Sequence, residues 1–315
     1  MKYVRQQVTE FLSTNIPEPV PEYSPSTTYI YESGEPTNDS LVRVGSFIYR
    51  SLINDNQDND PLDPDNLRTK WVRWAPSNAY SMLDMKSATK TTVQSTDTVI
   101  EDIIVEVAYT YGMDTLVIGN YASDGFLVEM IDGSDNVLWS YTQGGNLNED
   151  VIDYWTYTYS EYGYEADRAL MVNLGSFTNT VKIRVTLYGQ LEQPTECGYL
   201  VIGEGVEMGK TLRNVKFNFN SFTLKQFDDF GTATIIKRAI QDITDFETVI
   251  DSGMVPTMKR RIKSVYDDVV AFVVDESENS EYENLITLGT VQDASVIHDN
   301  HVESVITWSI VEIVA

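Results

Sequence analysis

The feature that most constrains the fold of this chain is a series of short apolar segments between residues 81 and 210. Turn clusters such as "SDG", "DGSDN" and "GSFTN" separate them. The segments predicted to be strands are "VIEDIIVEVAY", "TLVIGN", "FLVEMID", "NVLWSYT", "YWTYTYSEY", "ALMVNL", "TVKIRVTLYG" and "GYLVIGEG". Eight short strands at this spacing are typical of a β-sandwich or jelly roll. The alternation in "VKIRV" predicts a strand with one buried face and with Lys182 and Arg184 pointing outward.

Residues 26–80 have the pattern of a smaller β module. Two or three short strands are predicted there, with turns at Gly34, at Asn38-Asp39 and at Gly45. The many Tyr, Thr and Val residues of the chain also favour β structure over helix. We therefore expect a mainly β protein, in which a small module precedes the sandwich.

Residues 211–315 predict an α+β domain. The segments "VKFNFNSFTL", "VVAFVVD" and "SVITWSIVEIV" are expected to be strands. One helix is predicted in "PTMKRRIKSVYDD", where Pro256 suits the first turn. Its buried face is expected to be formed by Met258, Ile262, Val265 and Tyr266.

Residues 1–25 are predicted to be an N-terminal arm. Its apolar residues Val4, Val8, Phe11 and Leu12 fall on one face of a helix. Four prolines between residues 17 and 25 then favour an extended, stiff tether. A short amphipathic helix cannot bury its apolar face alone, so we expect the arm to dock onto a neighbouring subunit or another protein.

The charge of the chain is strongly acidic, with a net charge of −26 and a pI of about 4.2. Such a surface repels phosphate, so nucleic-acid binding is not expected. The basic run "KRRIK" at 259–263 is interpreted as a solvated helix face near a C-terminus. No apolar signal core and no run of 18 apolar residues occurs, so neither an export signal nor a membrane span is expected.

Few residues carry recognisable chemistry. Cys197 is the only cysteine and lies in an apolar strand pattern, which predicts an inert core thiol and fits synthesis in the cytosol. The polar segment 54–66 lacks the Gly and Glu positions of a calcium-binding loop, so a solvated acidic loop is expected. The histidines, His298 and His301, have no further ligand nearby for zinc.

Catalytic motifs are also missing from the sequence. Phosphate-binding loops, nucleophile elbows and His-Glu-x-x-His sequences do not occur. Paired carboxylates for sugar hydrolysis remain open, because 48 acidic residues offer many pairs and such pairs are recognised by geometry. We expect a protein that is not an enzyme and that needs no cofactor and no metal.

The segment "WVRWAPSNAYSMLD", residues 71–84, poses a question about Trp71 and Trp74. They form either an aromatic binding surface or part of a core. The favoured interpretation is a rigid joint between two β domains. In it, Trp71 closes the small module, Pro76, Ser77 and Asn78 make a turn, and Met82 and Leu83 begin the next core.

Residues 23–74 resemble the small chitin-binding type of carbohydrate module. The matching features are Tyr23, "STTY" at 26–29, Gly34, "GSFIY" at 45–49, Asn59 with Pro61, and Trp71. Two features depart from that pattern: Tyr23 stands where Trp is usual, and "EPTNDS" lengthens the hairpin. If the module binds glycan, we expect Tyr29, Tyr49, Trp71 or Trp74 to be exposed and coplanar.

The whole chain resembles a family of tailed-bacteriophage virion proteins that are often described as structural or carbohydrate-binding. The matching segments are "TEFLSTNIPEP", "WVRWAPSNAYSMLD", "GYLVIGEGVEMGKT" and "FGTATIIKRA". The resemblance implies a virion component of the tail, collar or connector, made in the cytoplasm of a host bacterium. Its partners would be copies of itself and other virion proteins. The alternative that it implies is a tail adhesin that binds host glycan.

Overall fold

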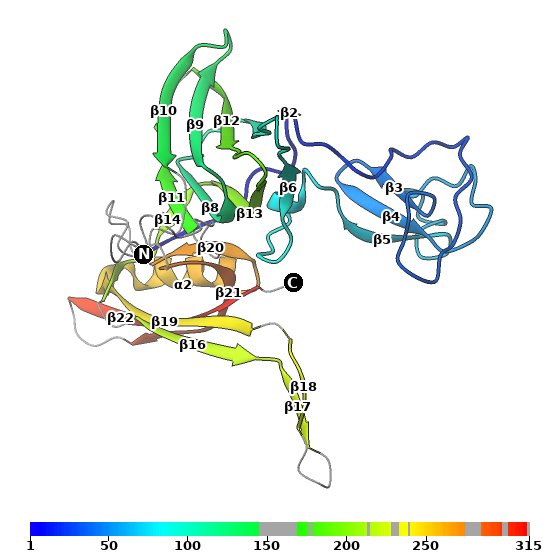
Figure 1. Cartoon of the computed structure of the whole chain (residues 1–315). Coiled ribbons are helices and arrows are strands. Elements are labelled where there is room, and N and C mark those ends of the chain that lie inside the picture. Colours follow the sequence, from blue (N-terminus) through cyan, green and yellow to red (C-terminus); the bar gives the residue numbers. More distant parts are fainter. Residues whose placement is uncertain are drawn as a thin grey trace, which may run out of the picture.

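The computed structural model describes residues 1–144, 169–175, 177, 179–212, 215–227, 233–238, 240–274, 285–297 and 302–313. The predicted strand "YWTYTYSEY" and both histidines lie outside these ranges. The mainly β fold is confirmed. In Figure 1 a small module lies to the right of a β-sandwich, and the C-terminal sheet with one helix lies below the sandwich.

The sandwich consists of two antiparallel sheets. The outer sheet has the order β10 (Val137–Gly144), β9 (Gly125–Asp132), β12 (Thr180–Tyr188), β7 (Ile103–Ala108) and β2 (Ser13–Thr14). The inner sheet has the order β11 (Ala169–Asn173), β8 (Thr115–Ala122), β13 (Pro194–Gly203) and β6 (Thr91–Gln94). The inward side chains of both sheets form one core, in which Val105, Val128 and Ile118 are fully buried. This arrangement agrees with the predicted sandwich.

The inner sheet is buried on both faces. In β8, Leu116 and Ile118 point into the sandwich core, whereas Val117 packs on the opposite side against the C-terminal sheet. β13 follows the same alternation, with Leu200 on one side and Val201 on the other. Double burial explains why these two strands are almost continuously apolar instead of alternating with polar residues.

The C-terminal sheet has eight strands. Its order is β14 (Gly205–Glu207), β1 (Lys2–Val4), β20 (Val270–Val273), β21 (Ile286–Ile297), β22 (Glu303–Glu312), β19 (Ile240–Asp251) and β15 (Lys210–Thr211), with β16 (Lys216–Ser221) also paired to β19. The terminal strands β14 and β15 are separated by only two residues, so the sheet curls back on itself. Gly209 lies in this connection with φ +106°, and a side chain there would collide with Ile250 and the Val249 carbonyl.

The predicted helix is present as α2 (Val255–Val265), preceded by the 3-10 turn η2 (Ser252–Met254). Pro256 lies in its first turn, and Met258, Ile262 and Val265 are buried against the C-terminal sheet. Tyr266 follows the helix and is exposed, so its predicted place in the buried face is wrong. The basic run lies on the solvent side, as predicted, except that Arg261 also donates to the Glu207 carbonyl at 2.6 Å.

The expected N-terminal helix and docking arm are wrong. Residues 2–4 form β1, which is paired on both sides, with Tyr3 opposite Val206 and Phe272. Val4 is fully buried between sheets, Val8 is buried in the sandwich core, Phe11 packs against that core, and Leu12 is exposed. The segment is a strap across its own chain. Backbone pairing with distant strands satisfies its polar groups better than a short isolated helix could.

The small module contains the three-stranded sheet β3 (Leu41–Val44), β4 (Phe47–Ser51) and β5 (Trp71–Pro76). Gly45 occupies the predicted β3–β4 turn with φ +58°. One face of the sheet carries an aromatic cluster around Trp71, and the other face carries Leu41 and Ile48, packed with Val20.

Cys197 provides a simple test of the packing of the inner sheet. It is fully buried on β13, and burial raises the pKa of its thiol to about 12. The thiolate is the reactive form, so the native thiol is expected to resist an aromatic disulfide reagent at pH 8. The same titration in denaturant is expected to yield one thiol per chain. A fast reaction of the folded protein would contradict the burial.

Candidate functional site

Three of the four aromatic residues proposed for glycan binding form a core. Tyr29, Tyr49 and Trp71 are 2%, 7% and 0% exposed. The Tyr29 ring meets the Trp71 ring edge-on, with 5.3 Å between centroids. The Trp71 indole N–H donates to the Asn59 carbonyl at 2.7 Å, so its polar atom is satisfied inside the module. These three residues therefore cannot stack on a sugar, and the interpretation of Trp71 as the closure of a core is confirmed.

The segment 54–66 is built into this core, and the prediction of a solvated loop is wrong for Asn56 and Asn66. Asn56 is 1% exposed, and its side chain donates to Ser51 Oγ at 3.0 Å and to the Lys70 carbonyl at 3.2 Å. Asp55 and Asp58 adopt left-handed backbone conformations, with φ 55° and 58°. Asn and Asp tolerate this conformation best, so turn geometry explains the alternating Asn and Asp residues.

Trp74 is the exception among the four aromatics, because 51% of it is exposed. The register of the β4–β5 pair shifts between Ile48 and Tyr49, and Trp74 falls in this irregularity. The Arg50 guanidinium lies 4.8 Å from the centre of the Trp74 ring. One ring under a cation gives a small aromatic surface rather than a row of coplanar rings.

The joint between the small module and the sandwich is fixed by Asn78. Its backbone N–H donates to Glu18 Oε2 at 3.0 Å, and its side-chain amide donates to the Pro17 and Thr92 carbonyls at 3.0 and 2.9 Å. Met82 is fully buried in the sandwich core, and Leu83 packs against it. The start of the next core at Met82 and Leu83 is thus confirmed. The turn lies later than predicted, because Pro76 is still part of β5 and the Tyr80 N–H donates to the Ser77 carbonyl at 3.1 Å.

A charged cluster lies on the outer face of the sandwich, on three neighbouring strands. Glu106 accepts from Arg184 Nη2 at 2.6 Å and from Lys182 Nζ at 3.2 Å, and Arg184 also lies 3.4 Å from Glu129. Partial burial alone would raise the pKa of Glu106, but hydrogen bonds from Arg184, Lys182 and Ser13 outweigh it and lower that pKa below its usual 4.5. Lys182 and Arg184 point outward, as predicted.

This cluster predicts a loss of stability in acid. A carboxyl whose pKa is lowered by folding stabilises the protein above its unfolded pKa, and this contribution disappears as the pH falls through the folded pKa. The free energies of unfolding of the wild type and of Glu106→Gln are therefore expected to differ at pH 7. They are expected to converge as the pH falls from the unfolded pKa of about 4.3 through the lower folded pKa. A difference that is independent of pH in urea titrations would contradict the pairing.

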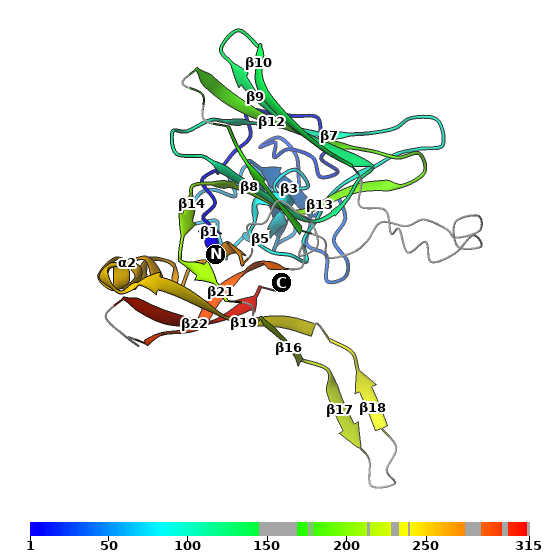
Figure 2. The same cartoon turned by 90° about the vertical axis from the view of Figure 1, so that its left-hand side faces the viewer.

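A ribbon with exposed apolar side chains projects from the C-terminal sheet and comprises residues 215–227 and 233–238. It is formed by β16 and by the hairpin of β17 (Leu224–Phe227) and β18 (Ala233–Ile236). Both views show the hairpin extending away from the rest of the protein (Figures 1 and 2). The exposed apolar side chains that it carries are Phe217 (46%), Phe219 (70%), Phe222 (49%), Ile235 (57%) and Ile236 (48%).

The aromatic face of the ribbon continues a covered face of the sheet. Phe217 lies opposite Thr244 on β19, on the same face as Phe246, which packs in the core that α2 covers. The helix has 11 residues and a length of about 16 Å, whereas the 12 residues of β19 extend for about 40 Å. The helix is too short to cover the whole strand. The opposite face of β16 is polar, and Asn218 donates to Asp245 at 2.7 Å.

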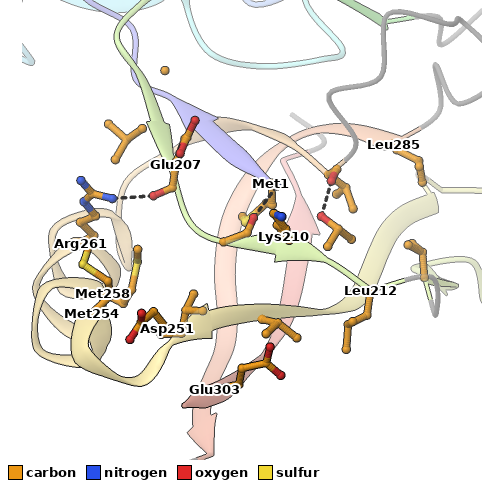
Figure 3. A pocket seen from close by; sticks show the side chains of 18 of the residues that line it. Met1, Glu207, Lys210, Leu212, Asp251, Met254, Met258, Arg261, Leu285 and Glu303 are labelled. Carbon is orange, nitrogen blue, oxygen red and sulfur yellow. Dashed lines mark hydrogen bonds between the residues drawn. The ribbon is translucent and has the colours of Figure 1, made fainter.

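A groove lies at the base of this ribbon, between α2, the end of β19 and the segment 204–212 (Figure 3). Its volume is about 1780 Å³. Its apolar lining includes Leu212, Val215, Met254 and Leu285, and Phe217 of the ribbon also contributes. Its charged lining residues are Glu204, Glu207, Asp251, Glu303, Lys210 and Arg261.

The ribbon was not predicted from the sequence as a candidate interaction site, although its composition differs from that of the rest of the chain. The stretch 215–240 contains five of the 11 phenylalanines of the chain. It also contains four basic and two acidic residues, a net charge of +2 in a chain of net charge −26. Such a concentration of aromatic residues and positive charge in a predicted strand pair distinguishes it from the rest of the protein.

Among the described residues, no group of three or more His, Cys, Asp or Glu side chains is arranged to hold a metal ion, and no helix is long and apolar enough to cross a membrane. Comparison of the chain with protein-family models, with curated proteins and with solved structures gave no match.

Proposed function

We propose that this protein is a non-enzymatic structural component of a tailed-phage virion, in the tail, collar or connector region. In this proposal it assembles in several symmetric copies and binds neighbouring virion proteins. The observation that carries the proposal is the projecting ribbon, in which Phe217, Phe219 and Phe222 are exposed together. Exposed apolar surface of this kind is typical of interaction sites, because burial in a complex removes it from water.

The shape of the ribbon also favours assembly. A two-stranded hairpin is only marginally stable in water, so one that extends from a domain gains from a partner surface. β16 is a sheet edge with all six residues exposed, and such an edge can pair with a further strand. The N-terminal strap packs against its own chain. In this proposal the ribbon, and not residues 1–25, binds the neighbouring protein.

The resemblance of the chain to phage virion proteins supplies the rest of the proposal. Its matched segments occur in the same order along nearly the whole chain, from "TEFLSTNIPEP" to "FGTATIIKRA". The last of these segments lies in the stretch 215–240. The proposal therefore assigns a role to one of the segments that carry the resemblance.

The direct test is to find the protein in purified particles. Virions are purified on a density gradient from cells infected with the phage that encodes the chain, and their proteins are quantified by mass spectrometry. We expect a fixed number of copies per particle, and antibody labelling at the tail or neck. Detection only in the cell lysate, and never in particles, would contradict the proposal.

A second candidate function is binding of host-surface glycan, which the exposed Trp74 favours. An exposed indole offers a flat apolar face to a sugar ring, on the side that the Arg50 guanidinium does not cover. A glycan array probed with the wild type and with Trp74→Ala tests this function. Binding that disappears in Trp74→Ala at an unchanged melting temperature would favour the adhesin over the structural proposal.

A further inference from the structure

We propose that the outer part of the ribbon, residues 222–227 and 233–238, binds in the groove of a second copy of the same chain. This inference rests on the proposed function and adds the partner and the two surfaces in contact. Each copy would present a ribbon to one neighbour and a groove to the other. Such head-to-tail contacts between identical subunits generate rings when the rotation closes.

The outer part of the ribbon cannot reach the Met254 end of the groove in its own chain. Phe222 follows Ser221, which lies opposite Ile240, the first residue of β19. Met254 lines the groove just beyond Asp251, the last residue of β19. The 12 residues of β19 separate the two positions by about 40 Å, so an outer ribbon that contacts Met254 must come from another molecule.

The size and the apolar lining of the groove fit a polypeptide segment. A volume of about 1780 Å³ exceeds the 300–1,000 Å³ of typical small-molecule sites. The groove offers Leu212, Met254 and Leu285, and the outer ribbon offers Phe222, Ile235 and Ile236. Burial of these side chains against one another would remove both apolar surfaces from water.

The charges of the ribbon and of the groove favour a second copy of this chain as the molecule that occupies the groove. Two chains of net charge −26 repel each other unless their contact brings opposite charges together. The outer ribbon carries exposed Lys237 and Arg238. The groove is lined by four acidic and two basic side chains and by the N-terminal ammonium group of Met1, so acidic groups outnumber basic ones by one. A basic ribbon and an acidic groove on the same chain are complementary, which favours association of the protein with itself.

Cysteine cross-linking tests this contact directly, since the native Cys197 is buried and is expected not to react. Phe222→Cys is made in one preparation and Met254→Cys in another, and the two are mixed at high concentration and oxidised. A disulfide requires Cα atoms closer than about 7 Å, so the two positions within one chain cannot be joined. We expect a dimer from the mixture, and a ladder of multimers from a chain that carries both substitutions.

Two controls make the result specific. Leu191→Cys places an exposed cysteine beyond the other end of β13 from the groove, and its mixture with Phe222→Cys is expected to give no dimer. Lys237→Glu with Arg238→Glu should reduce the cross-link between Phe222→Cys and Met254→Cys. Glu204→Lys with Glu207→Lys on the Met254→Cys chain should restore it. Rescue of this kind is expected only if the two charged surfaces meet.

The outcomes separate this inference from the proposed function. Cross-linking only between two Phe222→Cys chains, or only to a different virion protein, would overturn the ribbon-in-groove contact. So would the absence of cross-links in a protein that sedimentation shows to be multimeric. In each of these cases the protein could still be found in particles at fixed copy number, and the structural role would stand.

Discussion

Removal of residues 1–8 is expected to unfold the C-terminal sheet. β1 lies between β14 and β20, so the truncation leaves two strands without their shared partner. It also removes Met1, Tyr3 and Val4, which are buried on the two faces of the sheet. Full burial of one apolar side chain contributes about 1.5–3 kcal/mol, so these three together contribute roughly 4–9 kcal/mol. That loss is comparable to the whole stability of a typical domain.

Chemical denaturation of the truncated protein, followed by circular dichroism, measures this effect. Leu12→Ala is the matched control within the same strap, because Leu12 is 57% exposed and its truncation is expected to change stability by less than about 0.5 kcal/mol. A truncated protein with an unchanged unfolding midpoint would contradict the placement of β1. Such a result would instead support the prediction that residues 1–25 are an arm that docks onto another molecule.

Replacement of Trp71 by Ala is expected to cost about 3–5 kcal/mol of stability in the small module. The side chain is fully buried between Tyr23, Tyr29 and Tyr49, so its removal leaves a cavity. It also leaves the Asn59 carbonyl without its indole donor. Trp71→Phe is expected to be intermediate, because the ring volume is partly kept and the hydrogen bond is lost.

Trp74→Ala is the matched control on the same strand. Its side chain is half exposed, so a change within about 0.5 kcal/mol is expected. Urea unfolding of the three variants measures the differences in free energy. Equal effects of Trp71→Ala and Trp74→Ala would contradict the assignment of one residue to the core and the other to the surface.

The sequence correctly predicted those helices and strands whose own apolar spacing shows which of their faces is buried. Met258, Ile262 and Val265 recur at the helical period and do form the buried face of α2. The apolar runs of β8 and β13 predicted strands, and their near-continuous apolar character is explained by burial on both faces. Trp71 was correctly assigned to a core from its place in the module.

The N-terminal segment could not be predicted because its partners are far away in the chain. Val4, Val8 and Phe11 have helical spacing, yet Val4 is buried between sheets whereas Val8 and Phe11 pack in the sandwich core. Lys2 pairs with Glu207 and Val273, more than 200 residues distant. Local spacing carries no information about such pairing, and tertiary contacts override local preference.

The ribbon illustrates a second limit of local patterns. "VKFNFNSFTL" alternates as a strand with one apolar face should, and it does form β16. Alternation predicts that the phenylalanines are buried, but it does not say against what. In the single chain α2 is too short to reach them, so Phe217 and Phe219 stay exposed.

The central claim, that this chain is a virion subunit which assembles through its ribbon, is tested most directly by removing the ribbon. Ser221 lies opposite Ile240, so residues 222–239 can be replaced by an Asn-Gly turn that closes the β16–β19 pair as a hairpin. The variant is expected to keep the wild-type melting temperature, because none of the described side chains that it removes is buried. Copies per particle are then counted by mass spectrometry after complementation of a phage that lacks the gene. We expect the ribbonless protein to be absent from particles; its incorporation at the wild-type copy number would contradict the account.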